Sequence, residues 1–461
     1  MSNFKDQKIL IMGLGLHGGG LALAKYLRKE KAILTITDLK KEQELKASLS
    51  KLEKYKDIKY TLGRHDIQDF KEQDLIIQNP GVPSHSPYLK VAQENNIPIV
   101  NEAVMFFGLY PGQIIGITGT RGKSTTATLV HKLLKKKIKG NVLAGNIATV
   151  PMFTVLDKLK TNSYPVLELS SWHLECLGNY QRSPHIAVIT NVFKDHLNRY
   201  QSFSAYQKAK LINIKYQNKR DFAILNADHK ITLNFAQKTK AQVYFFSLKK
   251  KVKGAYLENN DIYFNNSKII SLKDIKLLGK HNLENILAAL VVAKILKVSH
   301  KDIKKVISSF KGLEYRLEKK GKVKNFEIFN DATSSSPEAT IAALNFLEKK
   351  PIILIAGGED KNLAYHKLAQ KIKEKVKFLL LLAGSGSEKL GQELNQLNYP
   401  SYQMITDINS LKEAYRLAFK HGRGPDSYLL FSPAAASFNM FLNEFARAKE
   451  FNKLINEKKK K

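Results

Sequence analysis

The sequence has one cysteine, one tryptophan and no long hydrophobic run. With Cys176 alone, no disulfide can form within the chain, which fits the reducing cytoplasm. No apolar run approaches the ~18 residues that a membrane span requires. The apolar stretch at 8–24 resembles a signal peptide only superficially, because glycines and a histidine interrupt it. We expect a cytoplasmic protein with no membrane partner.

Acidic residues and arginine are also scarce. There are 41 Asp and Glu against 75 Lys and Arg, which gives a formal net charge of +34. Only ten of the basic residues are arginine, and the 65 lysines are spread along the whole chain. A nucleic-acid surface would be clustered and richer in arginine, so we expect no nucleic-acid partner. The basic background favours polyanionic substrates such as nucleotides and diphosphates.

At 461 residues, the chain predicts about three domains of ~100–200 residues each. Strand and helix patterns alternate throughout, which is typical of parallel α/β sheets. We expect an α/β fold with a Rossmann-like domain at 1–101, a central P-loop ATPase-like domain with a mainly parallel sheet at 102–311, and a Rossmann-like domain at 312–461. The predicted strands lie at 8–12, 33–37, 75–78, 97–100, 114–118, 166–169, 186–190, 326–330, 352–356, 378–383 and 428–431. Helices are expected at 21–28, 123–136 and 281–296, and another that begins with Ser336 as its capping residue.

A glycine-rich loop follows the strand at 114–118 and precedes a helix. A loop that holds triphosphate needs glycines, so that backbone N–H groups can face the anion, with a lysine for the outer phosphates and a hydroxyl for Mg²⁺. The general pattern GxxxxGK[ST] is missed by one position, because Ile117 stands where glycine is expected and Gly116 comes just before it. The order of strand, loop and helix nevertheless predicts ATP binding. The expected ATP-binding residues of the loop are Gly119, Thr120, Arg121, Gly122, Lys123, Ser124 and Thr125.

Polar residues follow the other two predicted strands of the central domain. Glu168 ends one strand, and Asn191 with Asp195 follows the next. Open parallel sheets bind ligands at the carboxyl ends of their strands, so we expect these side chains to converge beside the loop.

The segment T-G-T-R-G-K-S-T at 118–125 resembles the signature of the Mur ligases and their folylpolyglutamate synthase relatives. Further segments resemble the branch of that family that adds glutamate to UDP-N-acetylmuramoyl-L-alanine. L-E-L-S-S-W-H-L-E at 167–175 is similar to its E-L-S-S-F-Q-L-E, and N-V-F-K-D-H-L-N-R-Y at 191–200 to its N-V-x-x-D-H-x-D-R-Y. Shorter likenesses are G-N-I at 145–147, Y-x-x-A-K-L at 206–211 and G-K-H-N with a further asparagine at 279–285.

The resemblance implies an ATP-dependent ligase of peptidoglycan synthesis that acts through an acyl phosphate. ATP and Mg²⁺, with two metal ions, would serve the reaction, and the partners would be UDP-N-acetylmuramoyl-L-alanine and glutamate, with the protein a monomer. Lys123, Asn146, Glu168, His196 and Lys210 would be catalytic, and Asn285 would contact ATP. Ser124, Glu168, His196 and Lys210 would hold metal, with Lys210 carbamylated by CO₂. On residue chemistry alone, Lys210 is more simply a solvated helix lysine, Glu168 a strand-end charge and His196 a loop histidine.

The N-terminal domain carries G-L-G-L-H-G at 13–18 after its first strand, with Asp38 at the end of the second. Taken alone, this fingerprint predicts NAD. By the resemblance the same surface binds the uridine diphosphate of the substrate, with Gly15, Leu16, His17, Asp38 and Gly81 as contacts. A nicotinamide would not explain the ATP loop, so we favour UDP.

In the C-terminal domain, G-L-E-Y-R at 312–316 resembles the family's G-L-P-H-R, which assigns ATP contacts to Arg316 and, at the following N-D pair, to Asp331. G-G-E-D-K at 357–361 and S-P-A-A-A-S at 432–437 would bind glutamate through Lys361, Ser437 and Phe438. Without the resemblance, these are an exposed turn lysine and a helix cap. The family lysine after the N-D pair is replaced here by Thr333, so one cation near the amino acid is missing.

Four alternatives stay open at this point. The amino acid could be D-glutamate, L-glutamate or another. The chain could be a folylpolyglutamate synthase-like ligase, an NAD-dependent oxidoreductase, or a binding protein that has lost the chemistry because of Thr333.

Overall fold

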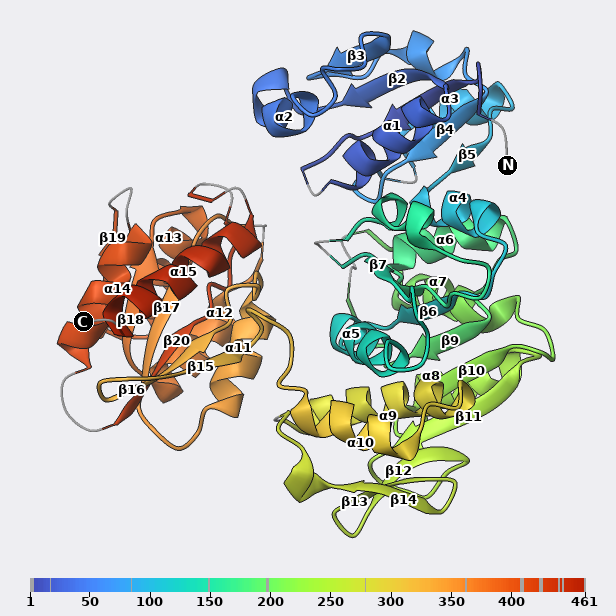
Figure 1. Ribbon diagram of the computed structural model, residues 1–461. Coiled ribbons are helices and arrows are strands. Elements are labelled where there is room, and N and C mark those ends of the chain that lie inside the picture. The colour runs from blue at the N-terminus through green and yellow to red at the C-terminus, as the bar shows by residue number, and fades with distance from the viewer. Residues whose placement is uncertain are drawn as a thin grey trace. The chain divides into compact units, whose positions relative to one another are not determined.

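The structure is a computed structural model, and it describes residues 4–16, 18–83, 85–147, 150–195, 199–277, 279–360, 363–406, 410–422, 426–437, 440–441 and 443–459. The chain forms two compact units, residues 1–310 and 311–461. The first contains two sheets and the second contains one (Figure 1). None of the helices in these ranges is both long enough and apolar enough to cross a membrane.

The N-terminal sheet has five parallel strands in the order β3-β2-β1-β4-β5. Its elements are β1 (Lys8–Met12), α1 (Gly19–Lys29), β2 (Ile33–Asp38), α2 (Glu42–Leu49), β3 (Ile58–Leu62), η1 (Ile67–Phe70), β4 (Leu75–Gln78), α3 (Pro87–Glu94) and β5 (Ile99–Val100). Side chains alternate along β1: Ile9 and Ile11 pack in the cluster that includes α1, whereas Leu10 and Met12 pack in the cluster that includes α3. Helices therefore cover both faces, as the Rossmann-like prediction requires. The strand predicted at 97–100 is shorter, because Pro98 has no N–H to donate to a ladder.

The central sheet has nine strands in the order β14-β13-β12-β11-β10-β9-β6-β8-β7. Its elements are α4 (Glu102–Leu109), β6 (Ile115–Thr118), α5 (Lys123–Leu134), β7 (Leu143–Gly145), η2 (Met152–Thr154), η3 (Leu156–Lys158), β8 (Val166–Glu168), α6 (Ser171–Asn179), β9 (Ile186–Ile189), α7 (Phe203–Lys215), β10 (Phe222–Asn226), α8 (Lys230–Phe235), η4 (Ala236–Lys238), β11 (Gln242–Ser247), β12 (Gly254–Glu258), β13 (Asp261–Phe264), β14 (Ser267–Ser271), η5 (Leu272–Asp274), α9 (Lys280–Ile295) and α10 (His300–Ser309). Six neighbouring pairs, from β7 through to β12, are parallel, so the prediction of a mainly parallel sheet is confirmed. α5, α9 and α10 share one apolar cluster with β6 and β9, and α7 packs in another with β9 and β10.

The antiparallel edge formed by β12, β13 and β14 was not anticipated from the sequence. Its two hairpins turn at Asn259–Asn260 and Asn265–Asn266, and all four asparagines have positive φ, between 43° and 71°. Two consecutive residues with positive φ define the type I′ turn that matches the twist of a hairpin, and asparagine tolerates that conformation. The paired asparagines were therefore a turn signal present in the sequence.

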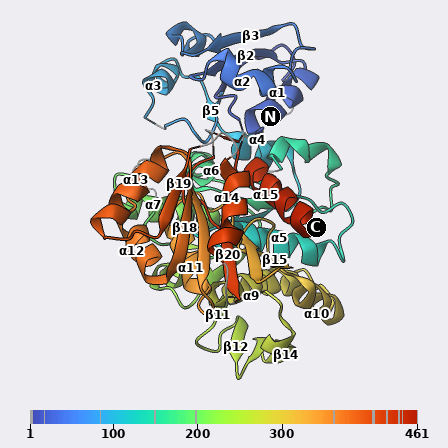
Figure 2. The ribbon, with the colours of Figure 1, turned by 90° about the vertical axis from the view of Figure 1, so that its left-hand side faces the viewer.

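The C-terminal unit has one six-stranded sheet in the order β15-β16-β20-β17-β18-β19. Its elements are β15 (Glu318–Val323), β16 (Phe326–Asn330), α11 (Pro337–Phe346), β17 (Ile352–Gly357), α12 (His366–Lys375), β18 (Val376–Leu382), α13 (Ser385–Gln396), β19 (Tyr402–Ile405), α14 (Ser410–His421), β20 (Ser427–Phe431) and α15 (Glu444–Lys459). Along β17, Ile353 and Ile355 pack with α14 and α15, and Leu354 and Ala356 pack with α11, α12 and α13. Helices thus cover both faces of this sheet, as Figures 1 and 2 show. Only β15 is antiparallel.

Ser336 is the N-cap residue of α11 and Pro337 is its first residue, as the sequence indicated. Its side chain, however, makes no capping hydrogen bond. The predicted position is confirmed and the predicted capping contact is wrong.

A fully buried arginine joins two loops of the C-terminal unit. Arg447, on α15, is 0% exposed, and its guanidinium donates to the carbonyl oxygens of Ala332 (2.9 Å) and Ala435 (3.2 Å). Burial lowers the pKa of Arg447 to about 10, so the group is still charged at neutral pH. The cation therefore holds the loop after β16 against the loop after β20.

Replacing Arg447 by methionine should destabilise the C-terminal unit. The change leaves two buried carbonyl groups without donors, so we expect the free energy of unfolding to fall by about 2–4 kcal/mol. Urea denaturation followed by circular dichroism would measure it. Arg416→Met is the matched control, because Arg416 lies at the surface beside Glu413 and its loss should leave the curve unchanged. Equal curves for the two variants would contradict the structural role of Arg447.

Candidate active site

The predicted phosphate loop joins β6 to α5. Gly119 has φ +147° and Gly122, the N-cap residue of α5, has φ +83°. A Cβ atom on Gly119 would lie 1.9 Å from Thr190 Oγ1, and one on Gly122 would lie 2.2 Å from Asn285 Oδ1. Glycine is therefore required at both positions, for backbone conformation and for space. Asn285, predicted to contact ATP, lies directly behind the loop and accepts a hydrogen bond from Thr126 Oγ1 at 3.2 Å.

Asn191 holds the loop in shape. Its carbonyl oxygen accepts from the Thr120 N–H (3.0 Å), and its side-chain oxygen accepts from the Arg121 N–H (2.9 Å). The hydroxyl of Thr190 donates to the Arg121 carbonyl oxygen (2.6 Å). The end of β9 and the loop after β6 thus come together, as predicted for the carboxyl edge of the sheet. By helix geometry, the first N–H groups of α5, at Lys123, Ser124 and Thr125, have no acceptor within the helix, so they can serve an anion.

Glu168, at the end of β8, is 2% exposed. Its Oε1 accepts from the Asn146 amide (3.3 Å), while its Oε2 is buried with no hydrogen-bond partner in the described part of the chain. A buried carboxylate with an unpaired oxygen needs a cation or donor to offset the loss of solvation. Magnesium takes hard oxygen ligands, so the carboxylate of Glu168 and the hydroxyl of Ser124 have the chemistry to hold it.

Lys210 contradicts the simple expectation of a solvated helix lysine. It lies on α7, is 2% exposed, and donates from Nζ to the Thr118 hydroxyl at 2.9 Å. The Thr118 hydroxyl in turn donates to the Leu169 carbonyl oxygen at 2.7 Å. Burial, together with the positive charge of Lys123, holds the pKa of Lys210 well below its ordinary value. This amine is therefore more easily neutral, and more nucleophilic, than a surface lysine.

His173 is a residue of this region that the sequence reasoning did not single out. It lies in the first turn of α6, is 2% exposed, and burial, followed by the charge of Lys210, lowers its pKa to about 4. Its only sequence signal was its place in the 167–175 motif.

Arg199 also escaped attention. Its guanidinium lies 4.7 Å from the centre of the Trp172 ring, 3.6 Å from the Glu175 carboxylate, and within 3.4 Å of the Val82 carbonyl oxygen in the turn after β4. It therefore bridges the N-terminal and central sheets beside the predicted UDP surface.

Four of the predicted site residues lie outside the described residues: His17, His196, Lys361 and Phe438. Among the residues that the structure does describe, no group of three or more His, Cys, Asp and Glu side chains forms a metal site. The predicted ligand set differs from such a group, because it includes a serine hydroxyl, a modified lysine and His196.

The glycine-rich loop of the N-terminal sheet lies where the sequence placed it, between β1 and α1. Gly15 has φ +64°, and its N–H donates to Asp38 Oδ2 at 3.0 Å. The other carboxylate oxygen accepts from the Lys40 N–H at 2.9 Å. Gly81 is exposed in the turn after β4, and Leu16 is partly exposed. Both carboxylate oxygens of Asp38 therefore stabilise the loop. The position of Asp38 in the fingerprint does not require a contact with a cofactor ribose.

In the C-terminal unit, the two segments predicted to bind the amino acid are paired with each other. Glu359 and Ala436 form an antiparallel bridge, with N–H to carbonyl oxygen distances of 3.1 and 2.9 Å. Ser437 is 2% exposed, and its hydroxyl is buried without a hydrogen-bond partner among the described residues. That hydroxyl is the group predicted to contact glutamate.

Asp331 and Thr333 both fasten the segment that begins the C-terminal unit. Asp331 is buried, and its carboxylate accepts from the Leu317 N–H (2.8 Å) and the Ser432 hydroxyl (2.7 Å). Thr333 Oγ1 donates to the Tyr315 carbonyl oxygen at 2.9 Å. Thr333 therefore has a structural contact of its own in place of the charge that a lysine would carry. Arg316 is exposed between these anchored residues.

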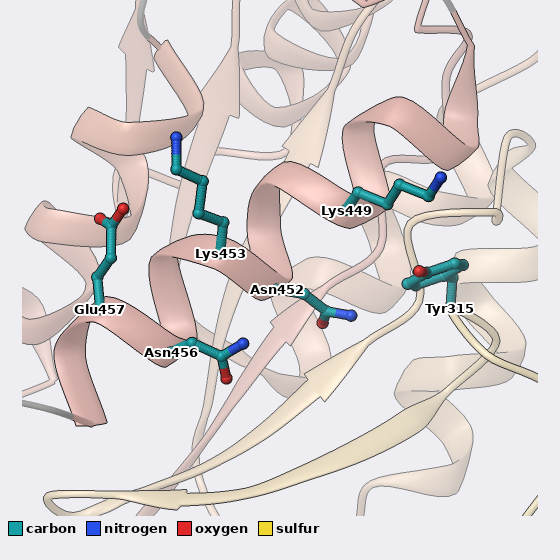
Figure 3. Close-up of a pocket in the computed structure, with 6 residues that line it drawn as sticks. All are labelled: Tyr315, Lys449, Asn452, Lys453, Asn456 and Glu457. Carbon is teal, nitrogen blue, oxygen red and sulfur yellow. The ribbon is translucent and has the colours of Figure 1, made fainter.

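A hollow of about 380 Å³ lies between Tyr315 and the exposed side of α15. Figure 3 shows Tyr315 facing Lys449 and Asn452, with Lys453, Asn456 and Glu457 along the rest of the helix. None of its lining residues belongs to the predicted amino-acid site, although Tyr315 precedes Arg316 directly.

Comparison with known proteins gives this geometry a family. A family model of the Mur ligase middle domain matches residues 117–293, and a model of the MurD-like N-terminal domain of Mur ligases matches residues 7–101. The chain belongs to the Mur ligase family. The middle-domain match covers the phosphate loop, Glu168 and Lys210, so the family resemblance drawn from the motifs is confirmed.

Relatives of nearly the same length are named UDP-N-acetylmuramoylalanine–D-glutamate ligase. The one from Roseiflexus sp. (strain RS-1) is 36% identical over 97% of this chain and 98% of its own length. Those from Borreliella burgdorferi and Clostridioides difficile are 36% and 34% identical, over 99% of this chain and at least 99% of theirs.

Solved structures share the fold at lower identity. The UDP-N-acetylmuramate–alanine ligase MurC of Thermotoga maritima superposes with a TM-score of 0.64 at 19% identity, covering 98% of this chain and 99% of its own. A pseudomurein peptide ligase type C from Methanothermus fervidus gives 0.58 at 18% identity, covering 98% and 100%. These likenesses confirm the three-sheet α/β architecture of the Mur ligases.

Replacing Gly122 by alanine should weaken nucleotide binding. The added Cβ would meet Asn285, and the positive φ at this position is unfavourable for alanine, so the loop must change shape. Isothermal titration with Mg·ATP should show at least about a tenfold loss of affinity. Gly391→Ala is the control, because Gly391 lies within α13 and its Cβ would make only ordinary contacts, at 3.5 Å or more. ATP binding by the Gly122 variant at normal affinity would show that the loop does not hold the phosphates.

Proposed function

We propose that this chain joins D-glutamate to the alanyl carboxylate of UDP-N-acetylmuramoyl-L-alanine, with ATP converted to ADP and phosphate, as a step of peptidoglycan synthesis. Relatives of that name match the chain over almost its whole length. The observation that carries the proposal is the buried amine of Lys210, which is hydrogen-bonded to Thr118, the residue immediately before the phosphate loop.

Activation of a carboxylate brings two anions together, the substrate carboxylate and the γ-phosphoryl group. Their repulsion must be offset by cations and N–H donors placed in advance. The first N–H groups of α5 and the ammonium of Lys123 supply such donors on the loop side. The γ-phosphoryl group then moves to the alanyl carboxylate, and the glutamate amine attacks the resulting acyl phosphate, so that an amide forms and phosphate leaves. Asn146 and His196 are proposed to orient the substrate.

Magnesium fits the chemistry of the residues proposed to hold it. Glu168 Oε2 is a buried anionic oxygen without a hydrogen-bond partner among the described residues, so it is free to ligate a metal. Ser124 would supply a hydroxyl, and His196 with the modified Lys210 would hold a second ion. The bound metal would neutralise charge on the transferring phosphoryl group.

Carbamylation of Lys210 follows from the same environment. A free amine cannot ligate Mg²⁺ as an anion, whereas a carbamate carries oxygen ligands. Only the neutral amine attacks CO₂, and burial favours that form. Because the pKa of Lys210 is lowered, the fraction of neutral Lys210 amine grows as pH rises through that lowered value and is lost at acidic pH. At a fixed concentration of dissolved CO₂, carbamylation should therefore increase with pH.

The substrate's uridine diphosphate is proposed to lie on the N-terminal loop, with contacts from Gly15, Leu16, His17, Asp38 and Gly81. Gly18, with φ +84°, is the N-cap residue of α1, so this helix also begins at a glycine-rich turn that can face an anion. The N-terminal family match at residues 7–101 supports UDP over a nicotinamide cofactor.

The remaining contacts are proposed for the C-terminal unit, with Arg316 and Asp331 toward ATP and Lys361, Ser437 and Phe438 toward the amino acid. The unpaired hydroxyl of Ser437 supports this assignment. The domain roles at 1–101, 102–311 and 312–461, the cytoplasmic location and the monomeric state belong to the same proposal.

Phosphate release with purified protein, Mg·ATP and UDP-N-acetylmuramoyl-L-alanine tests the reaction. We expect release with D-glutamate and only background release with L-glutamate or a folate acceptor. Faster phosphate release with L-glutamate than with D-glutamate would show that L-glutamate is the substrate. No release with any amino acid, while nucleotide still binds, would identify a binding protein.

Lys210→Ala should reduce the rate of phosphate release by at least about a hundredfold, because an anionic metal ligand is lost. Formate or acetate added at high concentration should restore part of the rate, since a small carboxylate can enter the space of the missing group. Lys208→Ala is the matched control: Lys208 lies on the same helix but is exposed, and its removal should leave the rate unchanged. If the Lys210 variant keeps its full rate, the role of Lys210 is wrong.

A further inference from the structure

The imidazole of His173 is buried at the start of α6. The backbone N–H of His173 donates to the Ser170 hydroxyl at 3.2 Å, and the backbone N–H of Ser170 donates to His173 Nδ1 at 3.4 Å. These reciprocal bonds form a capping box, with histidine in the place that Glu or Gln usually takes. They also hold the ring in one orientation.

The capping box decides which ring nitrogen carries the hydrogen. Because Nδ1 accepts a hydrogen bond, the neutral ring carries its hydrogen on Nε2. Burial keeps the ring neutral at physiological pH. His173 Nε2 is nevertheless buried without an acceptor in the part of the chain that the structure describes. A buried donor that is left unpaired is costly, so a partner should be sought in the chemistry of the site.

Lys210 is a neighbouring buried group, and its Nζ is hydrogen-bonded to a neutral hydroxyl. Its Nζ is connected through the Thr118 hydroxyl to the carbonyl of Leu169, and His173 is bonded to the next residue, Ser170. The ammonium of Lys210 is close enough to lower the pKa of His173. α6 and α7 also approach closely, because a Cβ atom on Gly178 would lie 3.0 Å from an Ile212 side-chain carbon. Lys210 Nζ and the unpaired Nε2–H of His173 are thus both connected to the residues that follow β8, and an acceptor group carried by Lys210 would satisfy the His173 donor.

We propose that the Nε2–H of His173 donates a hydrogen bond to the carbamate that CO₂ forms on Lys210, and that His173 is a positioning residue for this group. The inference rests on the proposed function, which includes the carbamate. In forming it, the lone pair of the neutral Lys210 amine makes a bond to the carbon of CO₂, one carbon–oxygen π pair moves onto oxygen, and one proton leaves Nζ for solvent. The product carries two oxygen atoms, so one can accept from His173 while the other remains for Mg²⁺.

Carbamate nuclear magnetic resonance tests the proposal on the full chain without ATP, UDP substrate or amino acid. Protein equilibrated with increasing ¹³C-bicarbonate at constant pH gives a carbamate signal, and Lys210→Arg assigns it to Lys210 by its loss. The His173→Leu variant keeps the bulk of the side chain but has no donor. The CO₂ concentration that gives half-maximal signal should be at least roughly tenfold higher than in the original protein, as expected for one lost hydrogen bond to a charged group. In His173→Gln, whose amide can donate from a similar place, the requirement should return toward that of the original protein.

His131→Leu is the matched control, because it removes a half-buried imidazole from α5 that is hydrogen-bonded to Asn141. Its carbamate titration should not change. The fluorescence of Trp172, the single tryptophan, which lies next to His173, would show whether the start of α6 keeps its fold in each variant.

The CO₂ requirement would overturn the proposal if it were equal in the original protein and in a folded His173→Leu variant. An unchanged carbamate signal with a raised KM for the UDP substrate would instead assign the Nε2–H to that substrate. Absence of any Lys210 carbamate would overturn the inference as well. Failure of the ligase reaction with D-glutamate would leave the carbamate titration unaffected, so the two proposals fail separately.

Discussion

The hydrogen bond between the Lys210 ammonium and the Thr118 hydroxyl joins the parts of the central site. It connects α7 to the end of β6, and Thr118 passes the connection to β8 through Leu169. Removing an ammonium group from water costs several kcal/mol unless other groups compensate, so this arrangement is stable only where polar atoms surround it. The polar atom that contacts it, the Thr118 hydroxyl, lies at the carboxyl end of β6, and β6 runs parallel between β8 and β9. The phosphate loop begins at the residue after Thr118, so its position and the position of the buried amine are set together.

The loop itself is shaped mainly by β9. Thr120 and Arg121 give their N–H groups to Asn191, and the glycines on either side permit the turn and the close approach of Thr190 and Asn285. The N–H groups that remain for a phosphate are those of the first turn of α5. Ile117 stands where the general pattern has its first glycine. It is a buried residue of β6, and the loop that follows is shaped without it.

Much of this organisation could be predicted from the sequence, because it depends on local signals. The strands before the phosphate loop and the N-terminal loop, the glycines and the polar residues at strand ends were all found where they were expected. Lys210 could not be assigned from local chemistry. The buried side of α7 consists of Tyr206, Ala209, Lys210, Asn213 and Ile214, and two of these are polar, so the apolar periodicity that reveals a buried helix face is interrupted. Lys210 donates to Thr118 of β6, and the Asn213 amide donates to the carbonyls of Gly116 in β6 and Val188 in β9, all of which are distant in sequence. His173 was not singled out for a related reason. Its place in the third position of a helix gives no sign in the sequence that its ring is buried.

The distribution of buried charge shows why a lysine-rich chain can still have selective sites. Of the 75 basic residues, Lys210 and Arg447 are the buried ones among the residues described, one in each compact unit. Within those ranges neither has an acidic partner at salt-bridge distance, and each is held by neutral oxygen atoms: a hydroxyl for Lys210 and two carbonyls for Arg447. A neutral acceptor leaves the charge of a buried cation in place, so the Arg447 guanidinium gives the C-terminal unit a positive potential beside loops proposed to receive an anionic substrate. The Lys210 amine, whose lowered pKa favours its neutral form, is instead the group proposed to become a carbamate. Salt screens surface lysines over about 10 Å, whereas buried cations are screened much less. Thr333 fits this arrangement. It stands where the family has a lysine, and the carbonyl of the residue before it, Ala332, accepts a hydrogen bond from the Arg447 guanidinium.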